Sequence, residues 1–189
     1  SFLFAVYLVL LYKYSETEDL LVTCPYANRE HSKLENVIGW FSQQIYLRIR
    51  LSPRYTFNDL LDRVNKKFLE VQEHQLAPRT LFEKLIPVVD MKQPYFRVGF
   101  SLEYYKKRTL PGLEVTALKI DKLKLTSPLP LNLIMLDMDD KLIASLFYYV
   151  DLFAQDTMAA MLKTYRHLLR IAVTEPNSSV NDMLSSLEH

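Results

Sequence analysis

The sequence predicts an α/β fold: a mixed-sheet α/β sandwich. Apolar residues switch between helical and strand periodicity along the whole chain, in the order helix, strand, strand, helix, short helix, four strands, helix. A doubly wound fold would alternate strand and helix regularly, which this order does not. Hydrophobic residues make up 49% and charged residues 24% of 189 residues, a composition typical of a globular chain that buries a core.

The chain opens with an apolar segment. Residues 1–12 carry no charge, which predicts a buried helix over residues 1–14. A membrane-spanning helix needs about 20 apolar residues, and a signal peptide would carry a basic start and a small-residue cleavage site. We therefore expect no membrane partner. The abrupt start predicts a boundary set by cloning or proteolysis.

Two strands and two helices follow. Residues 20–24 form an apolar run that ends at Pro25 and predict a buried strand, whereas apolar side chains alternate with Arg48 and Arg50 over residues 45–51, which is typical of a half-buried strand. Helical spacing predicts a helix over residues 56–75, with Thr56 as its N-cap and Asp59 three residues on. A short helix over 80–85 follows.

In the second half of the chain, apolar and polar side chains alternate as in β-strands, and a last helix follows. Strands are predicted over residues 96–103, 113–120, 131–137 and 142–150, the last two joined by a turn at Asp139-Asp140-Lys141. Asp156-Thr157 is predicted to cap a final amphipathic helix that continues to Val173.

Charge and glycine content exclude several functions. The 23 basic and 22 acidic residues give a net charge of +1, so no footprint for nucleic acid or an anionic membrane is present. Only three glycines occur, at 39, 99 and 112, which excludes glycine-rich phosphate loops. The single cysteine, Cys24, permits no internal disulfide, which favours a cytoplasmic protein. Because Cys24 lies in an apolar run, a buried structural thiol is favoured over a nucleophile.

No motif carries an active site by itself. The four histidines have no zinc-ligand spacing, so we expect no metal. Asp137, Asp139 and Asp140 fit a solvated turn better than a calcium loop. The basic-aromatic run over residues 104–108 fits a guarded sheet edge better than a nucleic-acid surface.

Several segments nevertheless resemble recurring motifs of condensation domains from non-ribosomal peptide synthetases. They occur in the family's order and cover nearly the whole chain. They are Pro25-Tyr26-Ala27-Asn28-Arg29, then Ile38-Gly39-Trp40-Phe41 with Leu47-Arg48, His74-Gln75-Leu76-Ala77-Pro78, residues 90–100, Leu110-Pro111-Gly112-Leu113, and Tyr149-Val150-Asp151-Leu152-Phe153.

The resemblance implies one lobe of a chloramphenicol-acetyltransferase-like fold, with residues 1–186 as the C-terminal lobe of a condensation domain. The last three residues, 187–189, are by themselves typical of a vector scar before a histidine tag. In that family two lobes enclose a tunnel into which peptidyl carrier proteins bring thioesters on 4'-phosphopantetheine arms, and an amine attacks to form an amide. The family's motif of two histidines, three residues and Asp-Gly belongs to the other lobe and does not occur here. We therefore expect no catalytic residue and no bound cofactor on this chain, which should be inactive alone.

Five residues are the candidates for the tunnel wall. Asn28 and Arg29 form a polar pair, with a structural alternative in which Arg29 binds loop carbonyls. Ser42-Gln43-Gln44 stands where the family has valine, asparagine and threonine, and the Gln43 amide would replace the asparagine on a longer stem. Leu129-Pro130-Leu131 lacks the usual aspartate, which puts hydrogen bonding near the tunnel floor in doubt.

Two other functions stay open. One is a non-catalytic lobe that serves as a docking platform for carrier or adenylation domains. The other is an acyltransferase of the same fold that uses a diffusible thioester. The expected partners are the missing N-terminal lobe, peptidyl carrier proteins and an adjacent adenylation domain. Because a lobe without its partner would expose an apolar face, a homodimer of the isolated lobe is also expected.

Overall fold

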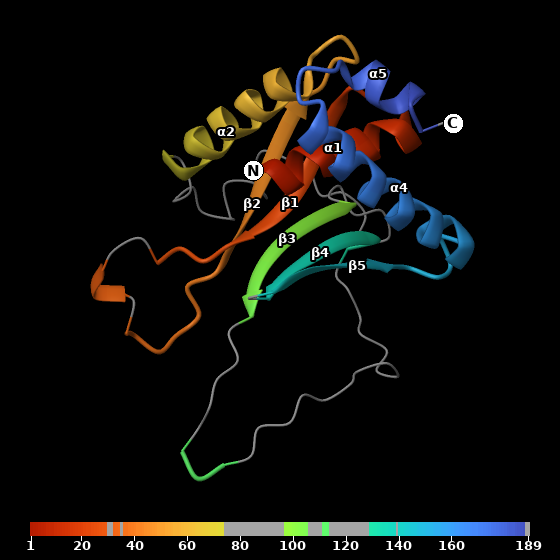
Figure 1. The fold of residues 1–189 in the computed structure, drawn as a ribbon. Coiled ribbons are helices and arrows are strands. Elements are labelled where there is room, and N and C mark those ends of the chain that lie inside the picture. Colours follow the sequence, from red (N-terminus) through yellow and green to blue (C-terminus); the bar gives the residue numbers. More distant parts are fainter. Residues whose placement is uncertain are drawn as a thin grey trace.

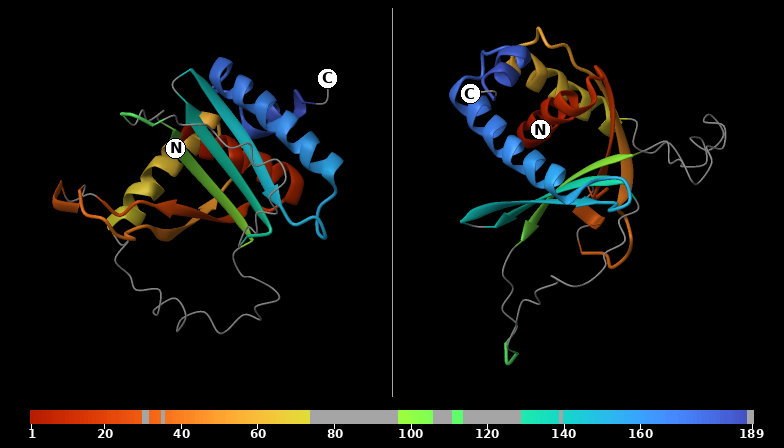
Figure 2. Two further views of the ribbon diagram at one scale, coloured as in Figure 1. Left: turned by 90° about the horizontal axis from the view of Figure 1, so that it is seen from below. Right: turned by 90° about the vertical axis from the view of Figure 1, so that its right-hand side faces the viewer.

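Helices lie on one face of a mixed β-sheet in the computed structural model (Figures 1 and 2), which describes residues 1–29, 32–34, 36–73, 97–105, 111–113, 129–138 and 140–187. The described elements are α1 (Phe2–Ser15), β1 (Asp19–Tyr26), the 3-10 helix η1 (Ser32–Leu34), β2 (Gln43–Arg50), α2 (Phe57–Glu73), β3 (Val98–Tyr105), β4 (Leu131–Met138), β5 (Lys141–Tyr148), α4 (Gln155–Thr174) and α5 (Val180–Ser185). The predicted α/β class is confirmed.

The sheet has the strand order β2-β1-β3-β4-β5. The outer pairs β1–β2 and β4–β5 are antiparallel, whereas β1–β3 and β3–β4 are parallel. β1 meets β3 at the single register pair Thr23–Gly99. A side chain at Gly99 would collide with Leu129 and Asn132, since a Cβ atom there would lie 2.5 Å from each. Glycine therefore permits the close packing of β3 against β4 and the preceding Leu129.

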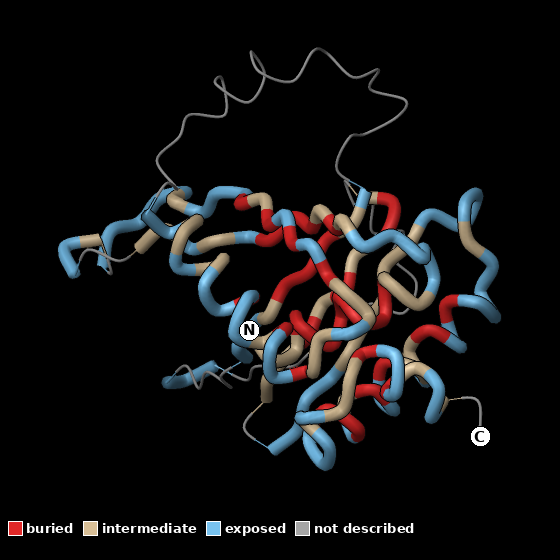
Figure 3. Tube along the Cα trace, turned by 90° about the horizontal axis from the view of Figure 1, so that it is seen from above, coloured by how far each residue is buried: buried red, intermediate tan, exposed pale blue. Residues whose placement is uncertain are grey.

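Helix α1 is the centre of the core because it carries apolar residues all around its axis. Every residue from Phe4 to Leu11 is buried. The Phe4 ring packs edge-on against Phe68 and Phe100, at centroid distances of 5.4 and 5.3 Å. The Tyr165 hydroxyl of α4 donates a hydrogen bond of 2.9 Å to the Leu3 carbonyl. Buried residues, red in Figure 3, concentrate where helices and sheet meet.

Helix α2 begins where the sequence predicts. The Asp59 N–H donates to Thr56 Oγ1 at 3.1 Å and the Thr56 N–H donates to Asp59 Oδ2 at 3.0 Å, which is a reciprocal capping box. The Thr56 hydroxyl, which donates to Asp59 Oδ2 at 2.7 Å, and then the Thr56 N–H lower the pKa of the Asp59 carboxyl. The N–H groups of Phe57 and Asn58 donate to the carbonyls of Ser178 and Pro176, respectively. The N-terminal end of α2 is therefore hydrogen-bonded to the segment before α5.

Two details at the C-terminal end differ from the predictions. The cap at Asp156-Thr157 is wrong: the N-cap of α4 is Ala154, without a side-chain bond, and the helix already begins at Gln155. Helix α5 was not predicted. Its N-cap Ser179 accepts a hydrogen bond from the Asp182 N–H at 3.1 Å. The spacing of Ser179 and Asp182, three residues apart, is the sequence signal that could have predicted this helix.

Other predicted elements are confirmed in part. The predicted first helix appears as α1, and the strands predicted at 20–24, 45–51 and 131–137 appear as β1, β2 and β4. The antiparallel pairing predicted across Asp139-Asp140-Lys141 appears as the β4–β5 hairpin, although Asp139 lies outside the described residues. The predicted helix at 80–85 and residues 114–120 also lie outside them. In the described part of the chain, no helix is long and apolar enough to cross a bilayer.

Candidate functional site

The five candidate residues meet at one end of the β1–β2 pair. The strands are in register as Tyr26–Gln43 and Pro25–Gln44, so the chain leaves β1 through Asn28 and Arg29 and returns to β2 through Ser42. We call residues 27–42 the β1–β2 loop. Antiparallel pairing thus brings together two motifs that are separate in the sequence.

Arg29 organises the β1–β2 loop. Its guanidinium donates to the carbonyls of Leu34, Val37 and Gly39, the last two at 2.9 and 3.0 Å. It also lies over the Phe41 ring, 4.5 Å from the centroid. A planar cation with several fixed donors suits this role, because it can satisfy several carbonyls at once. The structural alternative for Arg29, carbonyl binding within a loop, is what the geometry shows.

Asn28 turns the chain into the β1–β2 loop. Its φ angle is 51°, in the left-handed region that asparagine adopts more readily than most residues. The asparagine places the next residue, Arg29, half-buried beneath the loop carbonyls. Asn28 therefore has a clear backbone role in holding Arg29.

Gln43 and Gln44 are exposed, and Ser42 is exposed beside them. Consecutive strand residues point to opposite faces, and Ile45, Leu47 and Ile49 are buried toward the helices. Gln43 therefore shares the helix-covered face with these residues, whereas Gln44 lies on the other face with Tyr46 and Arg48. The two amides cannot act on one group from the same face of the sheet.

The same loop exposes large apolar side chains, which in the sequence stood out only as motif positions. Ile38 is 101% and Trp40 is 93% exposed, and Val37 is also exposed. The Trp40 Nε1–H donates to the Ser42 carbonyl at 2.8 Å, which holds the indole in place. Ile38 and Trp40 therefore present apolar surface to solvent at this end of the sheet.

Two buried hydroxyls lie on the sheet face away from the helices. Thr23 of β1 and Ser101 of β3 are buried, and within the described ranges neither hydroxyl has a hydrogen-bond partner. Phe100 packs on α1, so its neighbour Ser101 points to the opposite face, and the Thr23–Gly99 pair places Thr23 close by. Such groups are unusual in folded proteins. Strand serines and threonines carry no sequence signal for this.

The other candidate side chains are not gathered into a site. Burial raises the pKa of the Cys24 thiol to about 12, so the thiol stays protonated and unreactive at neutral pH, as predicted. His167 is exposed on α4. Tyr104 and Tyr105 are exposed at the end of β3, whereas residues 106–108 lie outside the described residues. Across the described ranges, no three histidine, cysteine or acidic side chains are placed to hold a metal ion.

The chain resembles bacterial peptide synthetases in sequence. It is 32% identical over 185 residues to a component of the linear gramicidin synthase of Brevibacillus parabrevis, which covers 94% of this chain and 2% of that protein. It is 32% identical over 183 residues to tyrocidine synthase 3 of the same organism, which covers 96% of the chain and 3% of the protein. The chain therefore spans only a few per cent of these relatives.

Solved structures share the fold. A four-domain nonribosomal peptide synthetase, AB3403, matches with a TM-score of 0.78 and 20% identity, over 96% of this chain and 15% of that one. The condensation domain of the monacolin K polyketide synthase MokA matches with a TM-score of 0.76 and 20% identity, over 95% and 42%. The condensation domain family model matches residues 1–189. This chain belongs to the condensation domain family.

Proposed function

We propose that the chain is one lobe of a domain that forms amide bonds between thioesters tethered to two peptidyl carrier proteins. The observation that carries this proposal is the family match over residues 1–189, combined with a sequence that lacks the family's histidine motif. A preceding lobe would then supply the histidine. The structural relatives support this division, since the chain covers 42% of the MokA condensation domain.

The reaction in this proposal is an aminolysis. The acceptor amine attacks the donor thioester carbonyl, the new C–N bond forms, the C–S bond breaks, and the phosphopantetheine thiol of the donor carrier leaves. The amine loses a proton, which the histidine of the other lobe would accept or orient. Because both substrates are tethered, most of the acceleration would come from their positioning.

This lobe would provide one wall of the substrate tunnel. Arg29 holds the β1–β2 loop by three carbonyls, so Ser42 and Gln43 are presented from a defined backbone. The exposed Ile38 and Trp40 would lie against the facing lobe.

The proposal is tested with the natural polypeptide that includes the residues before Ser1. Donor and acceptor carriers, each loaded with an aminoacyl thioester, are mixed with this domain, and mass spectrometry measures the dipeptide on the acceptor carrier. We expect a product only when both substrates are carrier-bound. Equal turnover with diffusible N-acetylcysteamine thioesters and no carrier would instead support an acyltransferase.

A docking lobe without catalytic function is the second candidate. The Ser42-Gln43-Gln44 departure and the exposed Ile38 and Trp40 favour it, since they alter the tunnel candidates while keeping a contact surface. In this case the natural polypeptide would bind loaded carriers or an adenylation domain and yield no dipeptide.

A further inference from the structure

A basic pocket lies between α2 and β2, away from the β1–β2 loop. It has a volume of about 420 Å³. Its lining consists of Arg48, Ile49 and Arg50 from β2 and Arg63, Lys66, Lys67 and Glu70 from α2. Five cationic residues and one carboxylate thus line a space large enough for several ligand atoms. Arg48 and Arg50 border it at the edge strand β2, with their side chains on the sheet face away from α2.

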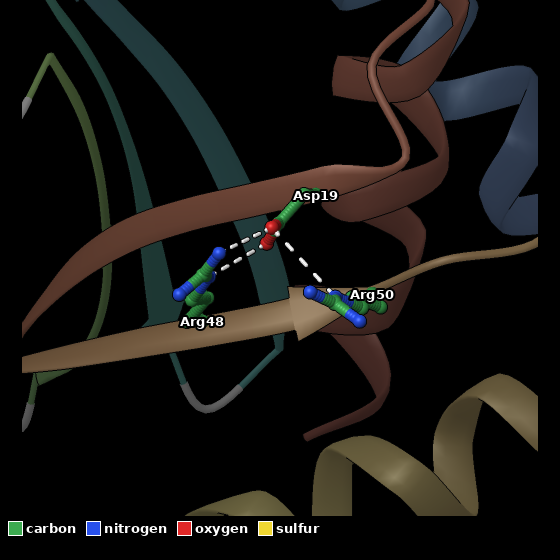
Figure 4. Close-up of polar contacts among 3 residues, drawn as sticks. All are labelled: Asp19, Arg48 and Arg50. Carbon is green, nitrogen blue, oxygen red and sulfur yellow. Dashed lines mark hydrogen bonds and ion pairs between the residues drawn. The ribbon is translucent and has the colours of Figure 1, made fainter.

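Part of this charge is balanced within the fold (Figure 4). Arg48 makes two hydrogen bonds to Asp19, at 2.9 and 2.6 Å, and Arg50 lies 3.7 Å from the same carboxylate. Arg48 chiefly, with Arg50, holds the pKa of Asp19 below its usual range, so the carboxylate stays ionised at neutral pH. Lys67 pairs with Glu70. The Asp59 carboxylate interacts electrostatically with Arg63. Three carboxylates therefore oppose five cations.

The remaining charge is concentrated here. The five cations and three carboxylates sum to +2, whereas the whole chain carries +1, so the rest of the chain sums to −1. Arg63 is also held in place, because its guanidinium lies 4.2 Å from the centroid of the Tyr55 ring. A fixed local excess of positive charge on a nearly neutral protein favours an anionic partner by charge complementarity.

The spacing of the cations points to a polypeptide partner. Arg48 and Arg50 lie two residues apart on one face of a strand, which separates them by roughly 7 Å. Arg63 and Lys67 lie one turn apart on α2, at roughly 6 Å. Carboxylates repeat at similar intervals along an acidic strand or helix. Nucleic acid would need a continuous basic surface, but Asp19 and Glu70 interrupt this one.

We propose that the pocket between α2 and β2 binds an acidic segment of a partner polypeptide. This inference goes beyond amide formation and does not depend on it, since it concerns a different surface and a different ligand. Arginine is suited to the role because its planar fork binds carboxylates through two hydrogen bonds.

The probe is a ten-residue fluorescein-labelled peptide of alternating glutamate and serine, measured by fluorescence anisotropy with this chain. The control peptide carries glutamine in place of glutamate. We expect the glutamate peptide alone to bind, and to bind more weakly as salt rises. Arg63→Gln with Lys66→Gln should weaken binding about tenfold, because two of five cations are lost.

The matched control removes two exposed cations from another helix, Lys163→Gln with Arg166→Gln on α4, and should change the affinity less than about twofold. A charge-preserving variant, Arg63→Lys with Lys66→Arg, should keep binding, which separates charge loss from misfolding. The proposal is overturned by no binding at low salt, by equal binding of the glutamine peptide, or by equal weakening in the α4 control. Displacement of the peptide by millimolar inorganic phosphate would make this a phosphate site instead.

Discussion

Arg29→Lys should lower the rate of the proposed carrier-to-carrier amide formation about a hundredfold, because misplacement of positioning groups by about 1 Å costs that much. The guanidinium satisfies three carbonyls of the β1–β2 loop and stacks on Phe41. A lysine keeps the positive charge, but its compact ammonium cannot bind all three carbonyls and stack on the Phe41 ring at once. The measurement is the single-turnover rate of the natural polypeptide with both carriers loaded.

Hydrogen exchange gives a second readout for the same variant. Amides of residues 36–42 should exchange faster in Arg29→Lys, whereas those of α1 should not change, since the core lies elsewhere. Arg54→Lys is the matched control, because Arg54 is an exposed arginine outside the loop and should leave the rate unchanged. If Arg29→Lys forms the amide at the normal rate although its loop amides exchange faster, the β1–β2 loop does not position the substrate.

Phe4→Ala should cost about 3–5 kcal/mol in the free energy of unfolding. The Phe4 side chain is fully buried and its ring contacts two others, Phe68 of α2 and Phe100 of β3. Alanine leaves a cavity at the point where two helices and the sheet meet, so few neighbours can move in to fill it. Urea unfolding followed by circular dichroism measures the loss.

Tyr14→Ala is the matched control on the same helix. Tyr14 is 43% exposed, so its loss should cost less than about 1 kcal/mol. If Phe4→Ala were no more destabilising than Tyr14→Ala, α1 would not be the centre of the core.

The elements with strong local signals could be predicted from the sequence. The apolar stripe of α2 and its Thr56–Asp59 capping box are local features, and both appear as predicted. The alternation of Ile45, Leu47 and Ile49 likewise predicted the buried face of β2. In each case the pattern is set by neighbours a few residues apart.

Features that depend on tertiary packing could not be predicted. Nothing in the periodicity indicates that β1, β3 and β4 run parallel in the centre of the sheet. Helix α4 begins at Gln155, with Ala154 as its N-cap, and not after the better local cap at Asp156, since packing of the helix overrides one side-chain bond. Charge at the α2–β2 pocket appears only when two segments of the chain are placed side by side.

The candidate site was predicted to a similar extent. Asn28, Arg29 and the Ser42-Gln43-Gln44 segment were found through motif resemblance, and strand register brings them together. Thr23 and Ser101 were missed, because a strand hydroxyl becomes notable only when burial leaves it unpartnered. The opposite faces of Gln43 and Gln44 follow from the start of β2 at Gln43, whereas the sequence predicts a start at Ile45.

The most direct test compares amide formation by three preparations: this chain, the segment of the natural polypeptide before Ser1, and the two joined. Each is given the same two loaded carriers, and the dipeptide on the acceptor carrier is measured. If the chain is one lobe of a condensation domain whose histidine lies in the other, only the joined preparation forms product. Product from this chain alone, at the rate of the joined preparation, would contradict that division between two lobes.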